Sequence, residues 1–211
     1  RKNNEEYIFS FDISEKQKCF VIKVKNKFES YWPQESGGNF FSYIKKNKEI
    51  KKINIYADSL DFERDKLVDF LSQFLFGFNL KSYTFNKYKT LKTETIKQKI
   101  DFKVITSIKE KIESNYKYYD AIKEGVFLTR DLVSEPPNIL NPEAYVKEIK
   151  KLSKFGLKVK SYNEKELKKL GLNALLGVGQ GSANETYLVT LEWKGKNNSL
   201  KEPLAFVGKG V

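Results

Sequence analysis

The chain has 211 residues, of which 40% are hydrophobic, including 16 Phe and 12 Tyr, and its formal net charge is +12. This length and composition suit a folded protein of one or two domains and exclude a disordered chain. Histidine is absent from the sequence, which excludes a Ser-His-Asp triad, a Cys-His pair and a His-rich zinc site within these residues.

The first hundred residues alternate strand and helix patterns, which predicts an α/β domain over residues 1–106. Strands are expected at residues 7–11, 18–24, 52–57 and 102–105. The run Ser36-Gly-Gly38 is typical of a break, after which Asn39 caps a short helix. A longer helix is expected to begin after Asp61 as its N-cap and to end at Gly77.

A continuous helical stripe of apolar residues over residues 107–133 predicts one long helix that connects two domains. Pro136-Pro137 ends this helix because proline cannot continue it. Residues 134–211 then begin a second α/β unit, with helices capped by Asn141 and Asn163. Strands of this unit are expected at residues 157–162, 187–193 and 204–207.

Two glycine-rich segments suggest phosphate binding, but neither carries the required pattern. The run Gly177-Val-Gly-Gln-Gly-Ser182 has serine where the dinucleotide fingerprint needs its last glycine, so we expect a tight structural loop. The run Gly208-Lys-Gly210 lacks the earlier glycine of a Walker A loop and the Ser/Thr that would hold magnesium. Taken alone, Lys209 is typical of a lysine on a surface turn.

The chain resembles the leucine (cytosol) aminopeptidase family in four segments whose order and spacing match. These are Thr129-Arg-Asp-Leu-Val-Ser-Glu-Pro-Pro-Asn138, Asn141-Pro-Glu143, Leu175-Leu-Gly-Val-Gly-Gln-Gly-Ser182 and Phe206-Val-Gly-Lys-Gly-Val211. The run Tyr83-Thr-Phe-Asn-Lys-Tyr-Lys89 is similar to a shorter signature late in the N-terminal domain of that family. The match is specific over residues 127–211, whereas over residues 1–80 only the α/β pattern agrees.

The resemblance implies an N-terminal α/β domain with a mixed sheet, a long connecting helix and the first part of an α/β metallopeptidase catalytic domain. It further implies an exopeptidase that removes N-terminal amino acids from peptides with two divalent metal ions, Zn or Mn, and that assembles as a homohexamer. Lys209 matches the lysine that is a metal ligand in the family. The other ligands, which are carboxylates, and the catalytic residues are expected beyond residue 211, so we expect the chain to be an inactive fragment.

A lysine binds a metal ion only through its neutral amine, so the cation must displace a proton. Residues 204–207 are apolar throughout, which predicts a buried parallel strand that presents Lys209 at its carboxyl end. Arg130, Asp131 and Glu135 have no metal-binding spacing. We expect them to be structural, as partners for the last carbonyl groups of the long helix.

The alternative function is a basic N-terminal domain that acts as a nucleic-acid-binding or regulatory module. Lysines and glutamates are mixed along the expected surface helices, as in residues 147–151 and 164–169, which makes nucleic acid an unlikely partner. No apolar run reaches the roughly 18–20 residues that cross a bilayer, so no membrane association is expected. The single cysteine, Cys19, is expected in the buried core of a cytoplasmic protein.

Overall fold

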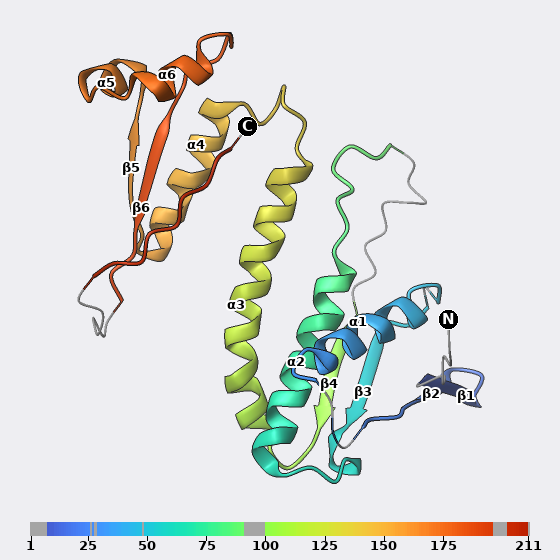
Figure 1. Ribbon diagram of the computed structural model, residues 1–211. Coiled ribbons are helices and arrows are strands. Elements are labelled where there is room, and N and C mark those ends of the chain that lie inside the picture. The colour runs from blue at the N-terminus through green and yellow to red at the C-terminus, as the bar shows by residue number, and fades with distance from the viewer. Residues whose placement is uncertain are drawn as a thin grey trace. The chain divides into compact units, whose positions relative to one another are not determined.

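The computed structural model describes residues 8–25, 27, 29–47, 49–90, 100–195 and 202–210. Two compact units make up the chain, Arg1–Asp131 and Leu132–Val211. Helices and strands alternate in each unit, which confirms the α/β class expected from the sequence (Figure 1). The finer division into domains 1–106 and 134–211 with a connecting segment between them stays a prediction.

The first unit contains one antiparallel and one parallel pair of strands. Strand β1 (Ile8–Ser14) pairs antiparallel with β2 (Gln17–Ile22), and β3 (Lys52–Tyr56) pairs parallel with β4 (Asp101–Ile105). All four expected strands are therefore present. The two kinds of pairing occur in separate two-stranded sheets within the described residues. A parallel pair needs a long crossover connection, and the segment between β3 and β4 provides it.

Helices α1 (Trp32–Ile44) and α2 (Arg64–Ser82) supply most of the core of this unit. Strand β3 leads into the short 3₁₀ helix η1 (Ala57–Ser59) on the way to α2. The buried cluster consists of Phe40, Ile44, Ile53, Ala57, Leu67, Val68, Phe70, Leu71, Phe74, Phe78, Ile108 and Ile112. Phe78 also meets Phe102 of β4 edge to face, with ring centroids 4.6 Å apart. This aromatic packing joins the two helices to the parallel strand pair.

The helix boundaries predicted from glycine are wrong in this unit. Gly37 lies inside α1 and Gly77 lies inside α2, so neither residue breaks or ends a helix. A Cβ atom on Gly37 would lie 1.9 Å from the carbonyl oxygen of Phe74, and one on Gly77 would lie 1.8 Å from that of Gln34. The two helix backbones approach so closely that only glycine fits at these positions. Asn39 accordingly lies within α1 and is not its cap.

Helix α3 (Lys109–Ser134) occupies the long helical stripe, which confirms the expected helix. It contacts α2 through paired polar side chains. The Asn79 amide donates hydrogen bonds to the Tyr116 hydroxyl, 2.8 Å away, and to the Leu75 carbonyl oxygen, 2.9 Å away. The Tyr119 hydroxyl donates to a carboxylate oxygen of Asp69 at 3.1 Å. These bonds satisfy polar groups that the packing of the two helices partly buries.

The second unit is built from α4 (Pro142–Lys150), η3 (Lys151–Phe155), β5 (Lys158–Tyr162), α5 (Glu164–Lys169), α6 (Asn173–Gly179) and β6 (Leu188–Glu192). Strands β5 and β6 pair antiparallel. The two caps predicted in this unit are confirmed, whereas α2 of the first unit begins after Glu63 and not after Asp61. The Asn141 side chain accepts from the backbone N–H of Ala144, and Asn163 forms a reciprocal capping box with Glu166.

Cys19 is half-buried, so its assignment to the buried core is wrong. It lies in β2 opposite Phe11 of β1, whose side chain is itself 56% exposed. A two-stranded sheet has little area to cover, and this pair leaves one face open to solvent. Among the helices within the described ranges, none combines the length and apolar character that spanning a bilayer requires.

Candidate functional site

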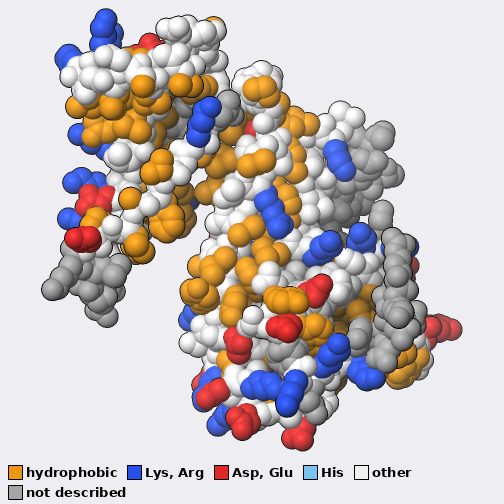
Figure 2. Space-filling view, in the orientation of Figure 1, with side chains coloured by type: hydrophobic (Ala, Val, Ile, Leu, Met, Phe, Trp, Pro, Cys, Tyr) orange, Lys and Arg blue, Asp and Glu red, His pale blue; other side chains and the backbone are white. Residues whose placement is uncertain are grey.

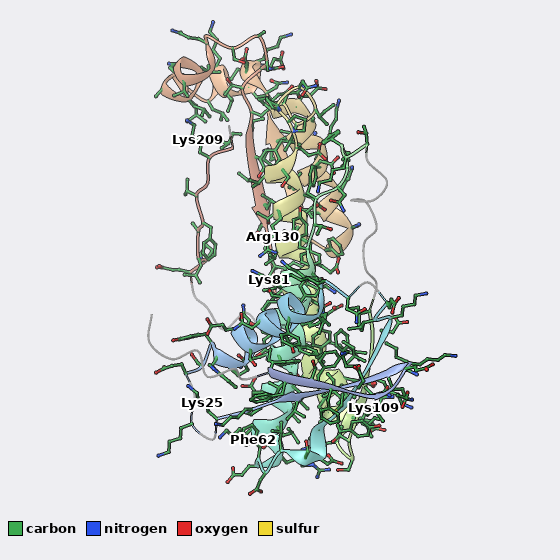
Figure 3. All side chains as sticks on the ribbon, turned by 90° about the vertical axis from the view of Figure 1, so that its right-hand side faces the viewer. Lys25, Phe62, Lys81, Lys109, Arg130 and Lys209 are labelled. Carbon is green, nitrogen blue, oxygen red and sulfur yellow. The ribbon has the colours of Figure 1, made fainter. Side chains whose placement is uncertain are left out.

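Lys209 lies in an extended segment, residues 203–210, that has no regular secondary structure (Figure 3). The side chains of Leu204, Phe206 and Val207 are 76%, 93% and 98% exposed, so the predicted buried parallel strand is wrong. Strands β5 and β6 pair with each other, and no strand within the described residues pairs with residues 204–207. Without a neighbouring strand and covering layers, an apolar run cannot be buried as a parallel strand. Lys209 is exposed as well.

The two glycines beside Lys209 have different surroundings. A Cβ atom on Gly208 would meet nothing within 4 Å. A Cβ atom on Gly210 would lie 2.8 Å from Cε1 and 3.1 Å from Cδ1 of Tyr145. Tyr145 belongs to α4, and its backbone N–H donates to the carbonyl oxygen of Asn141 at 2.9 Å. Figure 1 shows the C-terminal segment running beside α4, so Gly210 rests against a ring carried by a capped helix.

The described residues fit a metal ion only in part. Lys209 offers one exposed amine with space around it. Divalent ions need several nitrogen, oxygen or sulfur ligands. No group of three or more His, Cys, Asp or Glu able to hold a metal ion occurs in the part of the chain that the structure describes. Lys209 can therefore serve as a single ligand, and these residues do not form a complete metal site.

The glycine-rich segment 177–182 is not a loop throughout, because Gly177 and Gly179 lie in α6. A Cβ atom on Gly179 would lie 1.8 Å from Oγ1 of Thr186. The Thr186 backbone N–H in turn donates to Oε1 of Glu164 at 2.9 Å. These contacts tie the end of α6 to α5 and to the segment before β6. The expected tight loop is therefore wrong for residues 177–179, which are helical, and the turn begins only after Gly179.

Three apolar residues in and around α5 and α6 are exposed to solvent: Leu170 by 57%, Leu172 by 37% and Val178 by 70%. Figure 2 shows apolar side chains at the surface of this unit next to α5 and α6.

Arg130 and Asp131 make structural contacts at the end of α2. An Nη atom of Arg130 donates to the carbonyl oxygen of Leu80 at 2.7 Å, and its guanidinium lies 5.4 Å from the ring centroid of Tyr83. The Tyr83 hydroxyl donates to Asp131 at 2.7 Å. Leu80 is in the last turn of α2, where carbonyl groups lack a partner within the helix. The backbone N–H of Glu135 donates to a carbonyl group at the end of α3.

Two tyrosines with polar contacts were not predicted from the sequence. Tyr83, which begins the signature at 83–89, contacts Arg130 and Asp131. Tyr119 is the second, and its pKa is raised to about 12. Burial of the hydroxyl is the main cause, and the nearby negative charge of Asp69 adds to it. This hydroxyl therefore stays protonated well above neutral pH, as a donor in the packing of α2 against α3.

Residues 127–211 match the model of the cytosol aminopeptidase family, catalytic domain. A probable cytosol aminopeptidase of Phytoplasma mali (strain AT) is 43% identical over 181 residues, which is 84% of this chain and 35% of that protein. One of Agrobacterium fabrum (strain C58 / ATCC 33970) is 40% identical over 179 residues, covering 83% of this chain and 35% of that protein. The chain belongs to the cytosol aminopeptidase family. It spans about a third of the length of these relatives.

Solved structures show the same fold. A mutant of tomato leucine aminopeptidase matches with a TM-score of 0.74 at 20% identity, over 90% of this chain and 39% of that one. The bottromycin maturation enzyme BotP in complex with Mn matches with a TM-score of 0.69 at 19% identity, over 90% of this chain and 40% of that one. These structures show the fold, whereas the family model and the curated relatives confirm the resemblance of the sequence motifs to the cytosol aminopeptidase family.

Proposed function

We propose that the full-length protein containing this chain is a leucyl aminopeptidase-like enzyme that removes N-terminal residues from peptides with two divalent metal ions. The observation that carries the proposal is the match of residues 127–211 to the catalytic domain of the family. Lys209 lies within the matched residues, with an exposed amine beside two glycines. Homologues named cytosol aminopeptidases, each about three times as long as the matched region, support the activity of the longer protein.

In this proposal Lys209 is one ligand of a Zn or Mn pair, and the remaining ligands come from outside these 211 residues. When bound, a metal pair supplies Lewis-acid activation of water and of the peptide carbonyl. Lys209 contributes a neutral nitrogen after its amine has given up a proton.

The proposal extends to the organisation of the whole protein. Residues 1–106 form an N-terminal domain, residues 107–133 connect it, and residues 134–211 begin the catalytic domain. We place the enzyme in the cytoplasm as a homohexamer that acts on peptides, without nucleic-acid or membrane partners. The family name supports the cytoplasm and peptide substrates, and the mixed distribution of lysine and glutamate over the helices argues against nucleic-acid binding.

The test uses the full-length protein and two matched peptides, one with a free N-terminus and one with the same sequence N-acetylated. We expect release of the N-terminal amino acid from the free peptide alone. A chelator should abolish the release, and added Mn²⁺ or Zn²⁺ should restore it. Equal cleavage of both peptides, or turnover that survives complete metal removal, would contradict the proposed function.

A further inference from the structure

The segment after α2 meets the end of α3 through side chains that the proposed function does not use. Each of these two segments carries part of a signature that resembles the family, at residues 83–89 and 129–138. Tyr83 is the first residue after α2, and its hydroxyl donates to Oδ1 of Asp131 in α3 at 2.7 Å. This hydrogen bond therefore joins the two signatures inside the first unit.

Three more contacts surround the hydrogen bond. The Tyr83 ring lies 5.1 Å from the ring of Phe127, centroid to centroid, and the guanidinium of Arg130 lies 5.4 Å from the Tyr83 ring centroid. Arg130 also donates to the carbonyl oxygen of Leu80, in the last turn of α2, at 2.7 Å (Figure 3). Tyr83, Phe127 and Arg130 are half-buried, so solvent screens their contacts less than those of exposed groups. We call this group, Leu80, Tyr83, Phe127, Arg130 and Asp131, the Tyr83 clamp.

Helix α3 has a weak point just before the clamp. Gly125 is the single glycine of α3, and an added Cβ there would meet nothing within 4 Å, so packing does not explain its presence. Glycine weakens a helix because it loses more backbone freedom on folding than alanine does. The Thr129 hydroxyl donates to the Gly125 carbonyl oxygen at 3.0 Å, and such a bond to the residue four positions earlier often bends a helix. Both features favour bending of α3 at Gly125.

The clamp and two other hydrogen bonds between α3 and α2 lie on opposite sides of Gly125. Before it, the hydroxyl groups of Tyr116 and Tyr119 each form a hydrogen bond with a side chain of α2. After it, the clamp attaches the helix to the end of α2 and to the residue that follows. The match to the catalytic domain of the family begins at residue 127, which is within the clamp.

We propose that the Tyr83 clamp is a conformational device: it holds the part of α3 beyond Gly125 to the first unit and keeps the helix from bending at that glycine. Release of the clamp lets α3 bend there, and so loosens the attachment of the residues at which the catalytic-domain match begins. The inference rests on contacts within the first unit and does not depend on the metal chemistry of the proposed function.

Hydrogen exchange of the full-length protein, followed by mass spectrometry, measures this bending as local opening of α3. Tyr83→Phe removes the hydroxyl of the clamp and keeps the ring. We expect amide exchange at residues 126–131 to become about 3–10-fold faster, as for the loss of one hydrogen bond, with exchange at residues 113–120 unchanged. Tyr119→Phe is the matched control, because it removes another bond from a tyrosine hydroxyl to an aspartate, before Gly125. It should leave exchange at residues 126–131 as in the wild type.

Two double variants test how the clamp acts. Gly125→Ala strengthens the helix at its weak point, and its methyl group meets open space. Added to Tyr83→Phe, it should return exchange at residues 126–131 to within about twofold of wild type. Asp131→Ala removes the same hydrogen bond from the side of α3, so Tyr83→Phe should accelerate exchange no further in that background. Asp131 is exposed, so Asp131→Ala alone also tests the clamp if Tyr83→Phe does not fold.

Three results would overturn the inference. The first is unchanged exchange at residues 126–131 in Tyr83→Phe. The second is a uniform acceleration along the whole of α3, because the clamp would then contribute only to general stability. The third is a failure of Gly125→Ala to slow the exchange of Tyr83→Phe, which would show that α3 does not bend at Gly125. None of these results bears on the proposed function, which peptide release and its dependence on metal test separately.

Discussion

Replacing Gly37 by alanine should destabilise the first unit strongly. The new Cβ would lie 1.9 Å from the carbonyl oxygen of Phe74, 2.8 Å from its carbonyl carbon and 3.0 Å from the backbone nitrogen of Phe78. All three are backbone atoms of α2, so no side-chain rotation relieves the clash. Raising the shortest distance from 1.9 Å to 3.0 Å requires the helices to separate by at least 1.1 Å. That separation weakens the packing of the whole buried cluster between α1 and α2.

Overpacking typically costs about 1–3 kcal/mol, and replacing glycine by alanine inside a helix returns about 0.5–1 kcal/mol. Because the clash is with backbone, we expect the upper end of the overpacking cost, which leaves a net loss of about 2–2.5 kcal/mol in the free energy of unfolding. Urea unfolding of the 211-residue chain, followed by circular dichroism and tryptophan fluorescence, measures this loss.

The adjacent Gly38 provides the control, because its Cβ would lie 3.6 Å from the nearest atom, the Gly77 carbonyl oxygen. Gly38→Ala should therefore be neutral or stabilising by up to about 1 kcal/mol. A Gly37→Ala variant as stable as Gly38→Ala would refute the close helix contact and, with it, our explanation of why glycine lies inside both helices.

Two further predictions concern single polar contacts. The raised pKa of Tyr119, about 12, means that its protonated form stabilises the fold below pH 10, and that this stability is lost as the pH rises from about 10 to 12. Because the side chain is partly exposed, we expect the free energy of unfolding to fall by on the order of 1 kcal/mol between pH 9 and pH 11.5. Urea unfolding at the two pH values measures this loss, and the Tyr119→Phe variant should not show it. Asn163→Ala removes the capping box with Glu166 and should lower the free energy of unfolding of the second unit by about 1 kcal/mol. Hydrogen exchange at the first turn of α5 measures that loss, and unchanged protection there would show that the cap contributes nothing.

The sequence predicted the elements that local chemistry determines. Asn141 and Asn163 sit at helix starts because their side chains accept hydrogen bonds from backbone groups a few residues away. Gly156 follows η3 with a φ of 90°, a conformation that glycine adopts easily. Such signals involve neighbours in the chain, so a single sequence is enough to recognise them.

Features that depend on distant partners could not be predicted in this way. Gly37 and Gly77 have the local sequence signal of a helix end. They nevertheless lie inside helices, because the backbone of a second helix approaches each of them closely. The same distinction between local signals and distant contacts holds for the candidate site. The resemblance to the family singled out Lys209, but the contact of Gly210 with Tyr145 joins segments far apart in the sequence. The strand expected at residues 204–207 failed because burial of a strand depends on the strands beside it.

The role of Lys209 as a metal ligand is tested most directly by the metal content of full-length Lys209→Ala, measured together with its peptidase turnover. The wild-type protein should hold two divalent ions in each protomer. We expect the variant to lose most turnover and to bind one of the two ions much more weakly, with an unchanged fold by circular dichroism. Near-wild-type turnover with both ions bound would contradict the assignment of Lys209 to the metal site.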